Sequence, residues 1–308
     1  MNSLSRVKIL QLTVVGVVLV LLVRLFYLQV VDDSYKTRAD NNALRYMVQF
    51  PPRGEVYDRN GRFLVQSKEA YDLMATPREV GPFDTAAMSR ILGVPVEQIR
   101  KELDKASRFS RRRASVLFKQ LPKEVKVRLD ERNFPGFFTV YRTVRSYPTK
   151  IAGNLLGYVG EVDDRIIERN SYYRSGDYIG RSGIELAYED VLRGEKGVKI
   201  EMVDVHGIPQ GSYAGGMYDT LPSPGVAITC TIDARLQALA EELMAGKVGS
   251  VVAIEPETGE ILVMASSPTY DPDELVGRER GNNYMKLLND RRRPLFNRAV
   301  MASYPPGS

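Results

Sequence analysis

The chain has 308 residues, of which 44% are hydrophobic and 26% charged, a composition typical of globular proteins and a length sufficient for about two domains. Its one cysteine, Cys230, excludes an internal disulfide framework, and we interpret it as a buried, inert thiol. The single histidine, His206, has no Cys or His cluster to join, so we expect a surface turn residue and no metal site. The net charge of +5 is unevenly distributed along the chain.

An apolar segment follows the basic N-terminus. Residues 9–31 are mostly apolar and long enough for a helix of about 20 residues that crosses a bilayer. Arg6 and Lys8 precede this segment, and two aspartates follow it. The positive flank predicts a cytoplasmic tail at 1–8, a transmembrane anchor at 9–31 and an exported remainder. A cleaved signal peptide is the alternative, but no small-x-small cleavage site follows the apolar segment.

Residues 32–50 are expected to form a polar stem, helical from Ser34 to Gln49. The next segment contains the string R-G-x-V-Y-D-R-N-G. It predicts two short strands, Val56–Tyr57 and Phe63–Val65, around a tight turn, because Asn and Gly tolerate the positive φ that such turns need. The residues of interest in this string are Arg53, Gly54, Asp58, Arg59 and Gly61.

Residues 78–135 are predicted to be a helical insertion. Asp84, Pro95 and Pro122 can each start a helix, and apolar residues recur at helical spacing after each of them. Residues 100–132 contain twelve Lys or Arg and five Asp or Glu, a local net charge of +7. We interpret this basic segment as a solvated face, with contact to anionic lipid or a partner protein as the alternatives. Nucleic acid is not an expected partner, because the domain is exported and no aromatic stacking pattern accompanies the charges.

Strand-like sequence returns at Val140–Arg145 and at Asn154–Gly160. The string G-R-S-G-I-E follows, and its residues of interest are Gly180, Ser182, Gly183 and Glu185. Ser182 and Glu185 have the S-x-x-E spacing of a capping box, which predicts a helix. Its expected apolar face consists of Ile184, Ala187, Tyr188 and Val191.

The C-terminal third begins with a predicted strand at 198–203 and a Gly- and Pro-rich linker at 215–225. Val226–Ile232 is predicted to be another strand, and Asp233 can cap the helix that follows. Two apolar segments, Val251–Ile254 and Ile261–Met264, then flank a Pro-Glu-Thr-Gly turn, a pattern that predicts a β-hairpin.

The sequence finishes with Y-P-P-G-S. Pro305 and Pro306 end the preceding element, Gly307 allows a sharp turn, and Ser308 can then enter a helix. The first amides of a helix favour negative charge, so a nucleophilic serine fits this position. A plain N-cap serine fits it as well.

These motifs, in this order, resemble class B penicillin-binding proteins. The hairpin A-I-E-P-E-T-G-E-I-L-V-M-A-S, the string F-N-R-A and the final Y-P-P-G-S resemble the approach to the family's active-site serine. R-G-x-V-Y-D-R-N-G and G-R-S-G-I-E resemble motifs of the family's non-catalytic pedestal domain, where their role is structural. Asn154 departs from the family pattern, which often has histidine there.

The resemblance implies an α+β fold with a single N-terminal transmembrane helix. An elongated, mixed α/β pedestal of the dimerisation type would occupy 51–221, with its helical insertion at about 78–135. Residues 226–308 would begin a penicillin-binding/β-lactamase-like transpeptidase domain. The S-x-x-K lysine would lie three positions after Ser308, and the S-x-N and K-T-G motifs further on. The 308 residues alone are therefore expected to be inactive.

The function implied is that of an elongation-type peptidoglycan D,D-transpeptidase, with Ser308 as the nucleophile and no cofactor or metal. Its substrates would be stem peptides, and β-lactams would acylate the same serine. A polytopic glycosyltransferase and elongation-machinery proteins would be its partners at the bacterial inner membrane, with the N-terminus cytoplasmic and the bulk periplasmic. The alternative is a membrane-anchored interaction or scaffold module, or a β-lactam sensor, without transpeptidase activity.

Overall fold

The computed structural model describes most of the chain, namely residues 3–27, 44–204, 209–277 and 279–303. Contacts divide the chain into two units. The first unit consists of the described residues of 1–48 and 198–220, and the second of those of 49–197 and 221–308. His206, expected in a surface turn, lies outside the described residues.

The first unit begins with a 24-residue helix, α1 (Ser3–Phe26). Large apolar side chains from Leu12 to Tyr27 are exposed along it. Among the residues that the structure describes, no helix is both long enough and apolar enough to cross a membrane. The last part of the expected anchor, residues 28–31, lies outside the described ranges.

A three-stranded sheet in the order β1-β8-β9 completes the first unit. Its strands are β1 (Leu44–Gln49), β8 (Gly197–Val203) and β9 (Pro209–Ser212), and the 3₁₀ turn η2 (Tyr213–Gly216) follows. β8 confirms the strand predicted at 198–203, and it pairs antiparallel with β9. The helical stem is wrong at Leu44–Gln49, because β8 supplies this segment with a strand partner from a distant part of the sequence.

The second unit is built on a five-stranded sheet around one long strand, β3 (Phe63–Ala75). Its antiparallel partners are β2 (Val56–Tyr57), β4 (Ser115–Leu121) and β5 (Phe137–Ser146). The strands predicted around the D-R-N-G turn are confirmed. Pairing with β5, from Gln66 opposite Ser146 to Ala75 opposite Phe137, extends β3 well past the expected end at Val65.

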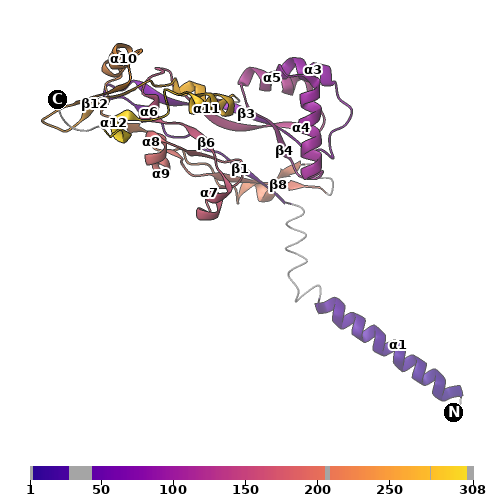
Figure 1. Cartoon of the computed structure of the whole chain (residues 1–308). Coiled ribbons are helices and arrows are strands. Elements are labelled where there is room, and N and C mark those ends of the chain that lie inside the picture. The colour runs from indigo at the N-terminus through magenta and orange to yellow at the C-terminus, as the bar shows by residue number, and fades with distance from the viewer. Residues whose placement is uncertain (1–2, 28–43, 205–208, 278, 304–308) are drawn as a thin grey trace. The chain divides into compact units, whose positions relative to one another are not determined.

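Three helices of the insertion pack at one end of this sheet (Figure 1). They are α3 (Thr85–Leu92), α4 (Val96–Phe109) and α5 (Lys123–Arg132). Each begins directly after the residue predicted to start it. The Asp84 carboxylate, for example, accepts a 2.9 Å hydrogen bond from the Ala87 amide and so caps α3. The basic residues Arg111–Arg113 that follow α4 are exposed.

The three predicted helices of the insertion are confirmed, but the insertion also contains a strand that was not predicted, β4. β4 pairs with β3, with Leu73 opposite Phe118 and Ala75 opposite Ser115. Leu73 and Phe118 also belong to a hydrophobic core with residues of all three helices: Met88, Ile99 and Leu129. The insertion is therefore joined to the sheet by backbone pairing as well as by apolar burial.

Short elements form the middle of the second unit. They are α6 (Gly153–Leu156), β6 (Val159–Glu161), α7 (Asp164–Arg169), β7 (Tyr178–Gly180), α8 (Gly183–Ala187) and α9 (Glu189–Leu192). β6 and β7 pair antiparallel. The strand expected at Asn154–Gly160 is wrong over its first half, which belongs to the helix α6. Two contacts hold this helix: the Glu241 carboxylate accepts the Ala152 amide at 2.7 Å at its start, and Leu156 at its end is fully buried.

Most of the C-terminal elements lie toward the end of the sheet away from the insertion, whereas α11 (Arg280–Asn289) lies nearer the insertion (Figure 1). They are β10 (Ile228–Thr229), α10 (Ala234–Leu243), β11 (Gly249–Ile254), β12 (Ile261–Ser267), η3 (Pro272–Leu275), α11 (Arg280–Asn289) and α12 (Arg298–Met301). β11 and β12 confirm the predicted hairpin, and Asp233 caps α10 as expected. The strand predicted at Val226–Ile232 is shorter than expected, and it pairs in parallel with β2.

Candidate functional site

The proposed nucleophile, Ser308, lies outside the described residues, which reach Ser303. The segment that leads toward it is held by two buried side chains. The Ser266 hydroxyl on β12 accepts a 3.0 Å hydrogen bond from the Arg298 amide and donates one of 3.2 Å to the Phe296 carbonyl. The Arg298 guanidinium donates to the carbonyls of three residues before it: Arg292, Arg293 and Phe296. These bonds fold residues 292–298 into a compact turn against β12.

The hairpin that carries Ser266 is itself fixed to α10. Gln237 is fully buried, and its side-chain amide bonds the backbone of Met264 in both directions. Gln237 Nε2 donates to the Met264 carbonyl at 3.1 Å, and the Met264 amide donates to Gln237 Oε1 at 2.9 Å. Residues 292–298 are thus held in place by β12, which is itself fixed to α10.

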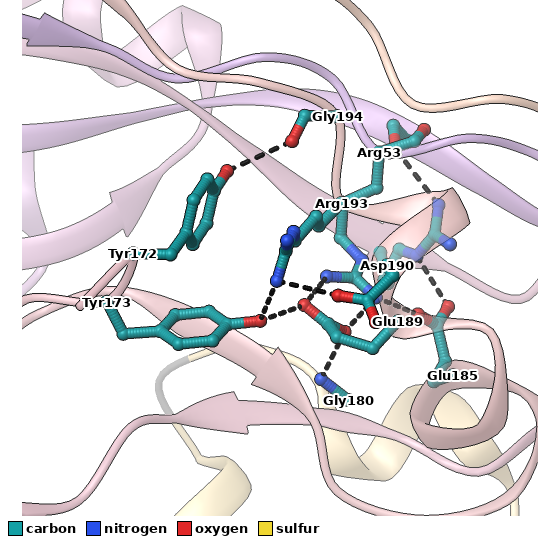
Figure 2. Close-up of polar contacts among 11 residues, drawn as sticks. Arg53, Tyr172, Tyr173, Gly180, Glu185, Glu189, Asp190, Arg193 and Gly194 are labelled. Carbon is teal, nitrogen blue, oxygen red and sulfur yellow. Dashed lines mark hydrogen bonds and ion pairs between the residues drawn. The ribbon is translucent and has the colours of Figure 1, made fainter. Parts of the chain in front are cut away.

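The two strings singled out in the sequence meet in a buried ion-pair network (Figure 2). Arg53, just before β2, donates from Nη1 to Glu189 Oε1 at 3.1 Å and from Nη2 to Glu189 Oε2 at 2.7 Å. Its Nη2 also bonds Glu185 Oε2 at 2.8 Å. Arg145, at the end of β5, donates from Nε to the other oxygen of Glu185 at 2.6 Å. Two guanidinium groups therefore neutralise two carboxylates inside the fold.

Charge balance explains how this network tolerates burial. Burial alone lowers the pKa of Arg53, but the charges and hydrogen bonds of Glu185 and Glu189 outweigh it and raise that pKa. Burial likewise favours protonation of Glu189, yet the hydrogen bonds and charge of Arg53 hold its pKa below the usual range. Both groups therefore carry charge at neutral pH, and Arg53 is the counter-charge that keeps the buried Glu189 carboxylate ionised.

The capping box predicted from Ser182 and Glu185 is wrong. The Ser182 side chain makes no capping hydrogen bond, although Ser182 does occupy the N-cap position of α8. Glu185 instead turns into the network with Arg53 and Arg145. The expected apolar face is confirmed only at Ile184, which packs against the core. It is wrong at Ala187, Tyr188 and Val191, which are exposed, while both glutamates are buried. Glu185 and Glu189 face the interior because Arg53 and Arg145, from distant segments, form ion pairs with them there.

Two glycines of these strings lie against backbone atoms so closely that a side chain has no room. A Cβ on Gly180 would lie 2.0 Å from the Glu185 carbonyl oxygen, and one on Gly54 would lie 2.0 Å from the Val226 carbonyl oxygen. Gly54 donates its amide to the Leu192 carbonyl at 2.8 Å, and Gly180 donates to Glu189 Oε2 at 2.8 Å. Side chains at these positions would push the network apart.

The D-R-N-G turn contacts the start of α10. Asp58 is fully buried; its Oδ1 accepts the amides of Asn60 and Arg62, both at 2.8 Å, and its Oδ2 accepts the Ala234 amide at 3.2 Å. Burial acts to raise the Asp58 pKa, but these backbone donors lower it overall. Arg59 pairs with Glu260 at a more exposed site, and Gly61 adopts the positive φ of the turn, 78°. One carboxylate thus shapes the turn and also bonds the first residue of α10.

Sequence reasoning missed Arg145 and Glu189 as members of this site. Glu189 lies four residues after Glu185, and that spacing of two acids on one helical stretch was an available signal. In the described part of the chain, no cluster of three Asp, Glu, His or Cys side chains could hold a metal ion. Burial raises the pKa of Cys230 to about 11, which leaves its thiol protonated at neutral pH.

Known protein families and relatives are similar to this chain over most of its length. Residues 48–230 match the family described as penicillin-binding protein dimerisation domain, and residues 249–308 match the penicillin-binding protein transpeptidase domain. Peptidoglycan D,D-transpeptidase MrdA of Escherichia coli K12 is 33% identical over 305 residues, which cover 94% of this chain and 47% of that protein. The protein of the same name from Acinetobacter baumannii is 32% identical, with 94% and 44% covered.

A solved structure shows the same fold. It is a complex between penicillin-binding protein PBP2 and MreC from Helicobacter pylori, with a TM-score of 0.64 and 26% sequence identity. The match covers 86% of this chain and 51% of the other. The chain spans about half the length of the curated relatives it matches.

Proposed function

The chain belongs to the penicillin-binding protein family, with a dimerisation domain followed by the start of a transpeptidase domain, and from this premise we propose that the full-length protein is a peptidoglycan D,D-transpeptidase. The observation that carries the proposal is the transpeptidase match over residues 249–308, which places Y-P-P-G-S at its end. The relatives named D,D-transpeptidase MrdA, similar over 94% of the chain, support an elongation-type enzyme.

In the proposed reaction, the Ser308 hydroxyl oxygen attacks the carbonyl carbon of the penultimate D-Ala of a stem peptide. The C–N bond to the terminal D-Ala breaks, the serine proton ends on the departing amine, and an ester acyl-enzyme remains. An amine of a neighbouring stem peptide then attacks the ester and frees the serine. A β-lactam would acylate the same oxygen through opening of its ring amide.

The test is covalent labelling of the full-length protein with a fluorescent penicillin. We expect stoichiometric labelling that Ser308→Ala abolishes, because the alanine has no nucleophile. Ser303→Ala, which removes an exposed hydroxyl five positions earlier, is the matched control and should label like the wild type.

Undiminished labelling of the Ser308→Ala protein would place the nucleophile elsewhere. Labelling at Ser308 without cross-linking of stem peptides would instead favour the β-lactam sensor. Neither labelling nor cross-linking would favour the scaffold module.

We further propose that residues 9–31 anchor the protein in the inner membrane, with residues 1–8 in the cytoplasm and the bulk in the periplasm. The support comes from the basic flank before the apolar segment and the acidic flank after it. Protease added to spheroplasts should therefore digest the exported part and spare an N-terminal tag. A protein protected until the membrane is lysed would contradict this topology.

The partner proposed for this chain is a component of the elongation machinery. The complex of Helicobacter pylori PBP2 with MreC supports an MreC-type protein, and we also propose a polytopic glycosyltransferase as a membrane partner. Affinity purification of the tagged protein from crosslinked membranes should recover both. Recovery of neither above the level of an unrelated membrane-anchored control would reject these partners.

A further inference from the structure

Asn154 on α6 bonds to three residues in two segments of the C-terminal part of the described chain. Its Oδ1 accepts a hydrogen bond from the Thr269 hydroxyl at 2.9 Å, and its Nδ2 donates to the Pro294 carbonyl at 2.9 Å. Its own carbonyl accepts from Asn297 Nδ2 at 3.4 Å. Asn154 lies in the segment that matches the dimerisation domain. Its side-chain NH₂ group, its side-chain oxygen and its backbone carbonyl all form hydrogen bonds to residues in the segment that matches the transpeptidase domain.

The contact with Asn297 matters because Asn297 is the N-cap of α12. The Asn297 Oδ1 accepts the Ala299 amide at 3.1 Å, while its Nδ2 reaches back to Asn154. Asn154 therefore bonds to both ends of the turn that precedes α12, to Pro294 at its start and to Asn297 at its end. The chain continues from α12 toward Ser308.

α6 is a firm support for these contacts. Glu241 accepts the Ala152 amide at 2.7 Å, and the Tyr270 hydroxyl donates to the Gly153 carbonyl at 2.8 Å. A Cβ on Gly153 would lie 2.5 Å from the Tyr270 carbonyl oxygen, so the backbone of α6 is in close contact with the backbone at Tyr270. Leu156, the last residue of α6, is fully buried. Asn154 therefore projects from a packed and capped element.

We propose that Asn154 is a positioning residue for the acylation reaction: it holds the turn at 294–297, and through it α12, so that Ser308 is presented in a reactive orientation. The inference rests on the proposed function. An asparagine amide suits this role because it offers donor and acceptor at once, and both are used here. Small misplacements of a nucleophile slow a reaction steeply, even when binding is unaffected.

The experiment measures the acylation kinetics of the full-length protein with a fluorescent penicillin, separating the first-order acylation constant from the apparent dissociation constant. Asn154→Ala loses both side-chain hydrogen bonds, and we expect its acylation constant to fall about tenfold. The dissociation constant should change less than about twofold. Asn154→His should retain most of the rate, because a neutral imidazole keeps one donor and one acceptor. Asn154→Asp keeps only the acceptor and should be as slow as alanine.

Asn283→Ala is the matched control, because it removes an asparagine side-chain hydrogen bond, from Nδ2 to the Glu274 carbonyl at 2.9 Å, without touching α6 or the turn at 294–297. It should acylate at the wild-type rate even if its melting temperature falls. Wild-type acylation of Asn154→Ala, or equal slowing in Asn283→Ala, would overturn the positioning role. Failure of the wild-type protein to acylate would overturn the proposed function and this inference with it, so the two failures are distinguishable.

Discussion

Replacing Arg53 by alanine is expected to destabilise the full-length protein by about 3–5 kcal/mol, since the change leaves buried carboxylates without their counter-charge. Arg53 makes three hydrogen bonds to Glu185 and Glu189, and Glu185 is completely buried. Arg145 can still neutralise one carboxylate, but Glu189 has no second arginine in its contacts within the described structure. Differential scanning calorimetry should show a fall in melting temperature of about 10 °C.

Two further variants make this test specific. Arg53→Lys keeps the positive charge but not the planar fork that reaches both carboxylates, so its loss should be intermediate. Arg59→Ala, in the same string, breaks a half-exposed ion pair with Glu260 and should cost less than about 1 kcal/mol. If Arg53→Ala melted within about 2 °C of Arg59→Ala, the network would not contribute as we infer.

Gly183→Ala should destabilise the protein by about 3 kcal/mol or more, for two reasons that add. Gly183 has a φ of 58°, which costs an L-residue about 1–2 kcal/mol. Its Cβ would also lie 2.3 Å from the Leu155 carbonyl oxygen and 2.7 Å from the Gly157 nitrogen. Both are backbone atoms, so α8 must move away from the α6 end to make room. Urea unfolding measured against the wild type gives the free-energy difference.

Gly61→Ala separates the two causes. Gly61 has a φ of 78°, but no atom lies within 4 Å of the position its Cβ would take. It should therefore show only the conformational cost of about 1–2 kcal/mol. Equal losses for the two variants would mean that the structure accommodates a Cβ at position 183 without a steric cost.

Local signals in the sequence account for the elements that were predicted correctly. Asp84 and Asp233 each cap their own helix with a side chain a few bonds from the amides it accepts, so a single chain segment contains all the needed information. The β11–β12 hairpin is similar, because its two strands and turn are contiguous. The order of the motifs, which identified the family, is also a property of the sequence alone.

Only the tertiary structure decided the contacts between distant segments. Glu185 has the spacing of a helix cap, yet it bonds two arginines, Arg53 and Arg145, that lie far from it in the sequence. β4 is a strand because β3 offers it a partner, which its own composition does not reveal. β10 was predicted as a strand, but its parallel pairing with β2 was not.

Asn154 shows the same limit for the candidate site. Its sequence neighbours suggest a strand, whereas its contacts with Thr269, Pro294 and Asn297 depend on a capped α6. The physical reason is that a residue's local conformational preference spans about 1 kcal/mol. Burial, charge pairing and backbone hydrogen bonds supplied from elsewhere in the chain exceed that preference. The sequence therefore determined the capped helices, the hairpin and the family, and the tertiary structure determined which side chains meet.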